Sequence, residues 1–434
     1  MKVVRLYHGG RDPAHRFRDR ALLAAGAEVV LVIPRRWAGS EHHDVVDEPG
    51  LRVVEVDVRR PGDVNRHTLT DAAAFVEVVT DVQPDLVDIA EEPFSSVAHQ
   101  VLGLLPATLP VVTYTAQNLD KRWPPPFCWW ERQAFARISG IYPCSRQAAS
   151  VVRGKGFTGV VQPIPLGFDP RRYHPGDQQA GDETLQLGLF GRMEAYKGVL
   201  DAVRVLAAVR RHRPARLTLV GDGPALADAL DLAARLQVAG SVEHHPWQPL
   251  DRLVESYRAV HFLLAPSRAT PRWVEQFGRT LIEGQASGCV VAGYASGSIP
   301  EVAGPGALIA PEGDADGLAA AIVALADDPA AYASAREVGL TQSRRCSWEQ
   351  VAEQQVAFYR TCMAHPAAPP GPAASRRQRA SAVAEFGRPA TVNGQDRPFA
   401  LPVLRSDTPL SRGLALALDA WGSRGEGSTR GRPG

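Results

Sequence analysis

Short apolar runs alternate with amphipathic segments over the first 169 residues. The apolar runs predict strands, and apolar positions spaced three or four apart predict helices. Strands are expected at residues 2–7, 28–34, 51–58, 85–92, 111–118, 140–145 and 159–165. Helices are expected at 71–83, 97–105 and 129–139, and a glycine loop runs into another helix within 8–26. This alternation predicts a mostly parallel sheet with helices on both faces.

A second alternating series begins at Leu185 and continues to about residue 328. Residues 170–184 lack periodicity and are rich in turn formers, so we interpret them as a linker. Residues 346–363 predict a long helix, with Ser347 as its N-cap and Gln350 completing a capping box. The pattern divides the chain into an N-terminal domain (1–169), the linker (170–184), a C-terminal domain (185–345), the long helix (346–363) and a tail (364–434).

Composition fits an ordinary globular protein of two or more domains. The chain has 434 residues, of which 45% are hydrophobic and 22% charged. The net charge of +1 favours no nucleic-acid partner, and no apolar run approaches the ~20 residues that span a bilayer. The N-terminus enters a strand at once, without a signal-peptide pattern. Five scattered cysteines without a CxxC pair predict free thiols and a cytoplasmic protein, with neither a disulfide framework nor a zinc site.

The last 70 residues differ in composition from the rest. They are rich in Pro, Ala, Gly and Arg, and ten Arg against five acidic residues give a charge of +5. We expect this tail to be disordered. Residues 410–421 are amphipathic enough for a weak helix that docks or makes a peripheral membrane contact, and a solvated tail without such a role is the alternative.

The first candidate chemistry lies in EQFGRTLIE, residues 275–283. Gly278 suits a backbone turn that a side chain would block, and a helix is expected from Arg279 to Gly288. The N–H groups of its first turn have no partners within the helix and favour an anion. Glu275 precedes the helix and Glu283 lies inside it, so both carboxylates could accept hydrogen bonds from sugar hydroxyls. A surface helix with two solvated glutamates is the alternative.

The second candidate is GRMEAYKG, residues 191–198, between a predicted strand (LQLGLF) and a predicted helix. Arg192 and Lys197 lie five positions apart in this glycine-bounded loop. A guanidinium grips two phosphate oxygens and an ammonium adds a mobile point charge, so the pair suits a diphosphate. Two ordinary solvated cations are the alternative.

Taken in order, four motifs carry a family resemblance: GRMEAYKG, LTLVGDGP at 217–224, EQFGRTLIE, and SGSIPEVAG at 296–304. Together they resemble the C-terminal half of a retaining, GT-B-fold glycosyltransferase of family 4. The N-terminal half is similar too, from Gly9-Gly10 to IPLGFD at 164–169, so the resemblance covers roughly residues 1–363. It implies an α/β fold of two Rossmann-like, doubly wound domains facing across a cleft, with the last helix crossing back onto the first domain.

The resemblance also implies a reaction. Such enzymes move a sugar from a nucleotide-diphosphate-sugar donor to an acceptor hydroxyl, without a metal ion or other cofactor. The acceptor is then a small molecule or a lipid-linked glycan, bound by the N-terminal domain. Two rival interpretations stay open: a nucleotide-sugar 2-epimerase, which shares the two-lobed fold, and a catalytically inactive relative that only binds nucleotide sugars.

Residue roles follow from the same resemblance. Arg192 and Lys197 contact the diphosphate, Glu275 lies near the donor sugar, and these three are the catalytic candidates. Glu283 holds the ribose hydroxyls. The full donor-binding set is Gly9, Gly10, Phe277, Gly278, Arg279, Thr280 and Glu283. Glu301, in SGSIPE, is a weaker candidate whose alternative is a helix-capping or turn glutamate.

Contacts to the donor sugar or to the acceptor are expected from the N-terminal domain, at Glu91, Glu92, Gln117 and Asn118. Many relatives place a histidine in the loop that here offers Gln117 and Asn118, so a histidine contact to the sugar is in doubt. Residues 121–132, rich in tryptophan, are further acceptor candidates or core residues. The only Asp-x-Asp, at residues 314–316, precedes a predicted helix and indicates an N-cap in preference to a metal site.

Overall fold

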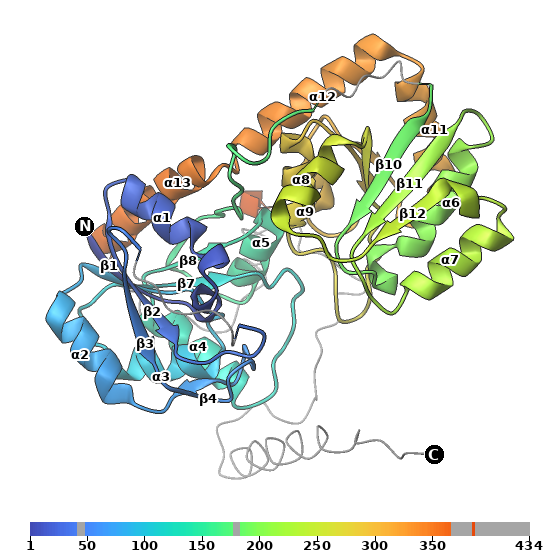
Figure 1. Cartoon of the computed structure of the whole chain (residues 1–434). Helices are drawn as coiled ribbons and strands as arrows, with labels where there is room; N and C mark the ends of the chain where they lie inside the picture. Colours follow the sequence, from blue (N-terminus) through green and yellow to red (C-terminus); the bar gives the residue numbers. More distant parts are fainter. Residues whose placement is uncertain (41–47, 177–182, 366–383, 387–434) are drawn as a thin grey trace.

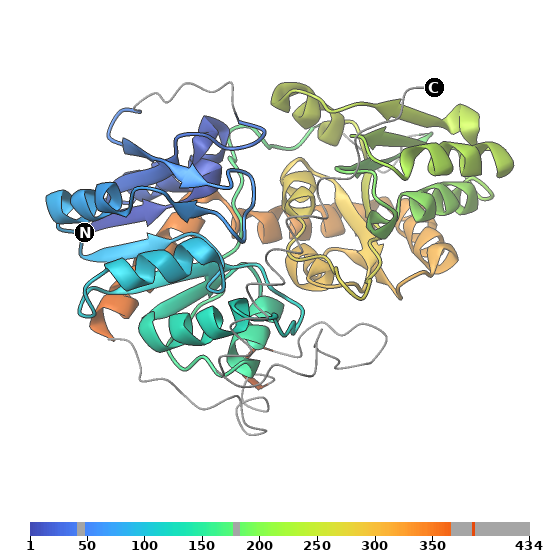
Figure 2. The ribbon, with the colours of Figure 1, turned by 90° about the horizontal axis from the view of Figure 1, so that it is seen from below.

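The computed structural model describes residues 1–40, 48–176, 183–365 and 384–386. The chain forms two α/β lobes that lie side by side (Figures 1 and 2). Each lobe is built on a parallel sheet, which confirms the predicted fold class. Most of the predicted tail, part of the predicted linker and the amphipathic run at 410–421 lie outside the described residues.

The N-terminal lobe, here the N lobe, contains a seven-stranded sheet in the order β3-β2-β1-β6-β7-β8-β9. Its strands are β1 (Lys2–Leu6), β2 (Glu28–Pro34), β3 (Arg52–Val56), β6 (Leu86–Ile89), β7 (Val111–Thr115), β8 (Gly140–Pro143) and β9 (Val160–Val161). A small antiparallel pair, β4 (Val58–Arg59) and β5 (Thr68–Leu69), lies beside it. The helices are α1 (Phe17–Ala24), α2 (Ala72–Val82), α3 (Ser96–Leu104), α4 (Phe127–Arg137) and α5 (Arg146–Gly154), with short 3-10 turns η1 (His8–Arg11) and η2 (Pro13–His15).

The C-terminal lobe, here the C lobe, contains a six-stranded parallel sheet in the order β12-β11-β10-β13-β14-β15. Its strands are β10 (Leu185–Phe190), β11 (Ala215–Val220), β12 (Val242–His245), β13 (Phe262–Ala265), β14 (Val290–Tyr294) and β15 (Leu308–Ala310). Its helices are α6 (Val199–Val209), α7 (Leu226–Arg235), α8 (Leu250–Arg258), α9 (Arg279–Ala286), α10 (Ile299–Ala303), α11 (Ala315–Ala326) and α12 (Pro329–Arg344), with 3-10 turns η3 (Ala195–Lys197) and η4 (Ala239–Ser241).

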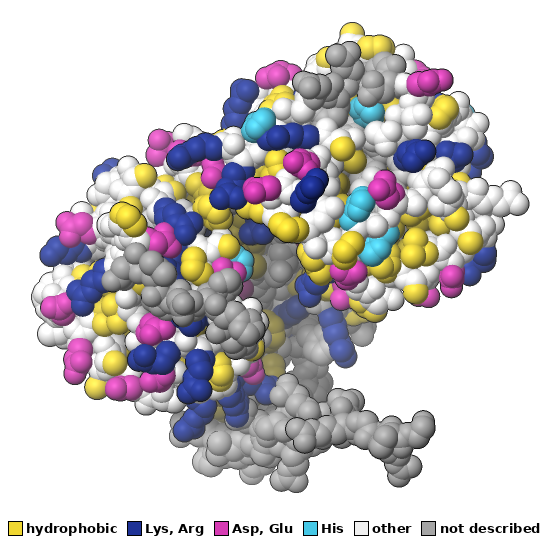
Figure 3. Space-filling model, in the orientation of Figure 1, with side chains coloured by type: hydrophobic (Ala, Val, Ile, Leu, Met, Phe, Trp, Pro, Cys, Tyr) yellow, Lys and Arg dark blue, Asp and Glu magenta, His cyan; other side chains and the backbone are white. Residues whose placement is uncertain are grey.

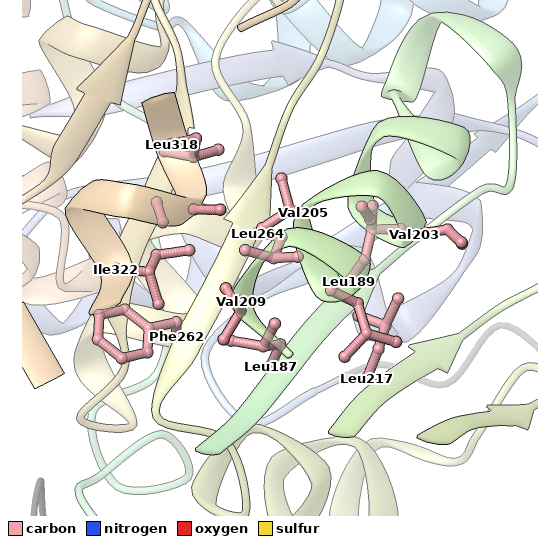
Figure 4. Close-up of a cluster of buried hydrophobic side chains, with 14 of the residues drawn as sticks. Leu187, Leu189, Val203, Val205, Val209, Leu217, Phe262, Leu264, Leu318 and Ile322 are labelled. Carbon is pink, nitrogen blue, oxygen red and sulfur yellow. The ribbon is translucent and has the colours of Figure 1, made fainter. Parts of the chain in front are cut away.

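The apolar runs form buried central strands because both faces of each sheet are covered by helices. In the C lobe, side chains from β10, β11 and β13 meet those of α6 and α11 in one core (Figure 4). Leu187, Leu217 and Phe262 in that core are fully buried. On the face shown in Figure 3, acidic and basic side chains are interspersed over both lobes, in keeping with the small net charge.

Two local expectations fail. Helix α5 is absent from the elements expected from the sequence, because its nine residues make fewer than three turns, although its apolar and polar side chains do lie on different faces. Gln350 does not complete a capping box. Ser347 caps the last helix as predicted, with its hydroxyl accepting from the Gln350 N–H at 3.3 Å, but the Gln350 amide donates to Glu353 at 2.9 Å.

Helix α13 (Trp348–Ala364) crosses back and packs on α1 of the N lobe, as expected (Figure 1). Its Tyr359 hydroxyl donates to Asp88 at 2.6 Å, and Tyr142 donates to the same carboxylate at 2.8 Å. Asp88 also forms an ion pair with Arg5 at 2.8 Å, and Arg5 contacts Asp19. All of these side chains are at most 2% exposed. The network therefore fixes α13 to the centre of the N-lobe sheet.

No single helix among the described residues is long and apolar enough to cross a membrane. Helices α11 and α12 pass that test only as a pair, by length and composition, with a bend of 108° between them.

Replacing Tyr359 by Phe should destabilise the N lobe by about 1–3 kcal/mol, because it leaves a buried Asp88 oxygen with one donor fewer. Urea unfolding monitored by circular dichroism measures the change. Arg360→Ala, at an exposed position of the same helix, is the control and should shift stability by no more than about 0.5 kcal/mol. Equal effects of the two variants would contradict the role assigned to the network.

Candidate active site

A cavity of about 500 Å³ lies between the lobes. The N lobe supplies Tyr114 and Ala116 at the end of β7, and Cys144 just after β8. The C lobe supplies most of the remaining wall, from the carboxyl ends of β10 and β13 and from the start of α9. Carboxyl ends of parallel strands are where α/β sheets bind ligands. The lining includes Arg192, Lys197, Glu275, Phe277, Gly278, Arg279, Thr280 and Glu283, so one cavity gathers the predicted catalytic residues and the C-lobe part of the donor-binding set.

Lys197 ends the turn η3, and its ammonium lies between two partners. Nζ is 2.7 Å from Glu275 Oε2 and 4.8 Å from the centre of the Trp273 ring. The turn needs glycine at position 198, where φ is +75° and a Cβ would lie 1.9 Å from the Pro266 carbonyl oxygen. An ammonium has three donors. It can therefore keep Glu275 and still donate to a phosphate oxygen.

Arg192 is one of two exposed cations of the cavity wall, the other being Arg279. Arg192 follows Gly191, whose φ of +122° turns the chain out of β10. Within the part of the chain that the structure describes, its guanidinium has no hydrogen-bond or ion-pair partner. Lys197 and Arg279 each already pair with a glutamate. Arg192 has no such partner among the described residues and can therefore bind an anion without competition.

Glu275 is held by both its side chain and its backbone. Besides Lys197, its Oε2 accepts from the Ser267 hydroxyl at 3.2 Å. Its carbonyl oxygen accepts from the Ser298 N–H at 3.0 Å. Gly297 makes that contact feasible, because a Cβ there would lie 2.3 Å from the Glu275 carbonyl oxygen. The EQFG and SGSIPE motifs are therefore two halves of one packed unit.

Gly278 is the N-cap of helix α9, and its φ of +80° suits glycine. The N–H of Leu281 bonds back to Gly278 at 2.9 Å. The preceding N–H groups, those of Arg279 and Thr280, have no intrahelical acceptor and lie at the cavity wall. The helix therefore presents free N–H donors and the positive end of its dipole to the cavity, which favours an anion there.

Glu283 lies one turn into α9 and is 6% exposed. Its carboxylate accepts from the Tyr257 hydroxyl at 3.1 Å and pairs with Arg279 Nε at 3.0 Å. Burial raises the pKa of Glu283, and Arg279 opposes that rise. The carboxylate is thus oriented on one side by a phenol and on the other by a guanidinium. Tyr257 and Ser267 were not predicted, since they lie 26 and eight residues before their glutamates and outside the motifs that carry those glutamates.

The four predicted N-lobe contacts do not line the cavity, and each has a hydrogen-bond partner of its own. Glu91 accepts from the His8 backbone N–H at 2.9 Å and pairs with His8 Nδ1 at 2.7 Å. The Asn118 amide donates to the Glu275 carbonyl across the lobes at 2.7 Å. Gln117 accepts from the Trp123 indole at 3.2 Å, while its buried Nε2 lacks a partner among the described residues. His8 was not predicted, and only its position before the glycine pair could have drawn attention to it.

Glu92 lies at the end of β6 beside the cavity-lining Ala116. It accepts from the Thr115 hydroxyl at 2.6 Å and from the Ala116 N–H at 2.8 Å. Burial raises its pKa to about 7, and these two hydrogen bonds oppose the rise.

Gly9 and Gly10 lie in η1, outside the cavity lining. A Cβ at Gly10 would lie 3.0 Å from Ile33, so this glycine packs closely on β2. Their approach to a diphosphate stays a prediction.

Two acidic candidates prove to be caps. Glu301 accepts from the Arg146 N–H at 2.7 Å, which caps α5 of the opposite lobe. Asp314 accepts from the Gly317 N–H at 2.9 Å and caps α11, as predicted.

Replacing Glu92 by Gln tests its buried charge. Its folded pKa of about 7 exceeds its ordinary value of 4.5, so ionisation should cost folding free energy as pH rises from about 4.5 to 7. Between pH 5 and pH 8, the wild type should therefore lose roughly 2–3 kcal/mol relative to Glu92→Gln, as measured by urea unfolding. Glu77→Gln, at an exposed position of α2, should show no such trend. A stability difference that stays constant with pH would refute the buried charge.

Two sequence comparisons show which known proteins this chain is similar to. Residues 20–167 match the family described as Glycosyl transferase 4-like domain, and residues 184–328 match Glycosyl transferases group 1. D-inositol 3-phosphate glycosyltransferase of Segniliparus rotundus is 30% identical over 218 residues, and that of Nocardia farcinica is 36% identical over 143 residues. The matches cover 46% of this chain and 46% of the first relative, and 30% and 31% for the second, so the chain spans about half or less of these relatives.

Solved structures share the two-lobed fold. Sucrose-phosphate synthase from Thermosynechococcus elongatus superposes with a TM-score of 0.65 at 19% identity, covering 84% of this chain and 99% of that one. Anabaena HepE, in complex with UDP and glucose, gives a TM-score of 0.60 at 16% identity, covering 83% and 100%. At these identities the likeness concerns the fold.

Proposed function

Because the chain belongs to the GT-B glycosyltransferases that join a 4-like domain to a group 1 domain, we propose that it transfers a sugar from a nucleotide-diphosphate donor to an acceptor hydroxyl. One observation carries the proposal: a single cavity brings together three cations, the free N–H groups of α9 and two oriented glutamates. Departure of a nucleoside diphosphate builds negative charge. Preorganised cations and N–H donors lower the free energy of a transition state of that kind.

The proposed donor would bind in one orientation, with its diphosphate, sugar and nucleoside each against different residues. Arg192, Lys197 and the start of α9 would hold the diphosphate, and Glu275 would face the sugar. Glu283, fixed by Tyr257 and Arg279, would hold the ribose hydroxyls. Trp247, whose side chain is 59% exposed at the cavity wall, offers an aromatic face for the base. HepE was solved with UDP and glucose, which supports a donor of this class.

The finer features of the reaction are proposals as well. We propose retention of the sugar's anomeric configuration and catalysis without a metal ion, in line with the family resemblance. The acceptor, a small molecule or a lipid-linked glycan, would approach from the N lobe near Glu91, Glu92 and Gln117. Free thiols at all five cysteines favour a cytoplasmic location.

A panel of UDP-, GDP-, ADP- and dTDP-sugars, offered with hydroxyl acceptors in the presence and absence of EDTA, tests the proposal. The expected result is a glycoside with the donor's anomeric configuration by NMR, formed at equal rates with and without EDTA. A donor converted to its 2-epimer without acceptor would indicate the epimerase. An unchanged donor that still binds would indicate an inactive relative.

Lys197→Ala should lower turnover by ~10²–10³, since it removes a preorganised charge from the leaving diphosphate. Initial rates at saturating donor measure the loss. Lys2→Ala, at an exposed position at the start of β1, is the matched control and should leave the rate unchanged. Near-normal turnover by Lys197→Ala would refute its assignment.

A further inference from the structure

The segment of residues 272–276, which carries Glu275, is bonded to the N lobe at four points. The weakest bond runs from Cys144 Sγ to the Gln276 carbonyl at 3.6 Å, and the other three come from one loop. The Gln276 amide donates to the Ala116 carbonyl at 2.9 Å. The Asn118 amide donates to the Glu275 carbonyl at 2.7 Å, and Lys121 Nζ donates to the Arg272 carbonyl at 2.8 Å. These three N-lobe partners lie on the loop that follows β7. One loop of the N lobe therefore makes three hydrogen bonds with one segment of the C lobe.

Asn118 is the central and most buried of these three N-lobe partners, at 3% exposure. Its bond ends on the backbone of the residue whose carboxylate pairs with Lys197. The same carbonyl accepts from the Ser298 N–H of the C lobe at 3.0 Å. The Glu275 carbonyl thus accepts a hydrogen bond from each lobe, and its N-lobe donor is the side chain of Asn118.

The position of the segment also sets the surroundings of Lys197. Trp273 lies two residues before Glu275, and its ring centre is 4.8 Å from Lys197 Nζ. The carboxylate and the aromatic face that fix the ammonium therefore belong to the same short segment. Any displacement of that segment would move both partners of Lys197 together.

We propose that Asn118 is a positioning residue that aligns Glu275, and through it Lys197, when the N lobe lies against the C lobe. This rests on the proposed function, because that function assigns the Glu275–Lys197 pair to the donor. Asn118 acts through the Glu275 backbone and needs no contact with the sugar. It gives the N lobe a direct means of ordering charges that belong to the C lobe.

The chain supplies a matched control in Gln147. Its side-chain amide also crosses the lobes to a backbone carbonyl, that of Gly297, at 2.7 Å. Gly297 packs on the Glu275 backbone, so Gln147 is bonded to the same packed unit but not to residues 272–276 themselves. If Asn118 only helped to hold the lobes together, losing either amide would have similar consequences. If Asn118 positions Glu275, its loss should speed hydrogen–deuterium exchange in residues 272–276 and lower turnover, and the loss of Gln147 should not.

Hydrogen–deuterium exchange of residues 270–278 in the full chain, without ligand, tests the contact itself. Asn118→Ala should speed exchange there by at least about tenfold, and Gln147→Ala by less than about threefold.

Turnover of the nucleotide sugar accepted by the wild type tests the consequence. Asn118→Ala should lower kcat by about tenfold or more with KM within about threefold, because small misplacements of catalytic groups cost large factors in rate. Asn118→Asp, isosteric but without the donor, should behave in the same way and serves if the alanine variant does not fold.

Unchanged exchange in both Asn118 variants, or equal changes in Asn118→Ala and Gln147→Ala, would overturn the positioning role. Faster exchange in Asn118→Ala together with undiminished kcat would overturn it too. Faster exchange specific to Asn118→Ala, in a protein whose wild type turns over no nucleotide sugar, would support the contact and overturn the proposed function.

Discussion

The ion pair between Lys197 and Glu275 is the constraint on which the site depends. It joins two C-lobe loops that are 78 residues apart in the chain, and each loop brings its own ligand-facing groups to the cavity. The Lys197 loop brings Arg192, and the Glu275 segment leads directly into α9 with its free N–H groups and Glu283. The pair therefore sets the distance between the cations and the start of the helix. The proposed diphosphate would contact both at once.

Glycines make this close packing feasible. A Cβ at Gly198 would lie 1.9 Å from the Pro266 carbonyl oxygen, and one at Gly297 would lie 2.3 Å from the Glu275 carbonyl oxygen. Each glycine lets one loop rest directly on the backbone of another. The motifs that contain them are thus explained by contact between backbones, which holds the charged side chains in place without occupying the cavity.

The fold and the C-lobe half of the site follow from the sequence because their determinants are local. Gly278, the apolar run after it and Glu283 predict the start of a helix and what it carries. The N-lobe half could not be obtained in this way. Nothing near Asn118 indicates that its amide meets the Glu275 carbonyl 157 residues later, or that Glu91 pairs with His8 83 residues before it. Such pairs are set by strand order and lobe contact. Helix α5 was not predicted because its nine residues are too short a run for apolar periodicity to identify a helix.

The proposed function requires that the cavity receive the diphosphate of a nucleotide sugar. A crystal structure of the protein soaked with such a donor tests it most directly. Density for the diphosphate is expected between Arg192 and the first turn of α9, with Lys197 within hydrogen-bond distance and Glu283 against the ribose. An empty cavity at saturating donor, or a diphosphate bound elsewhere with Arg192 and Glu283 turned to solvent, would contradict the proposed function.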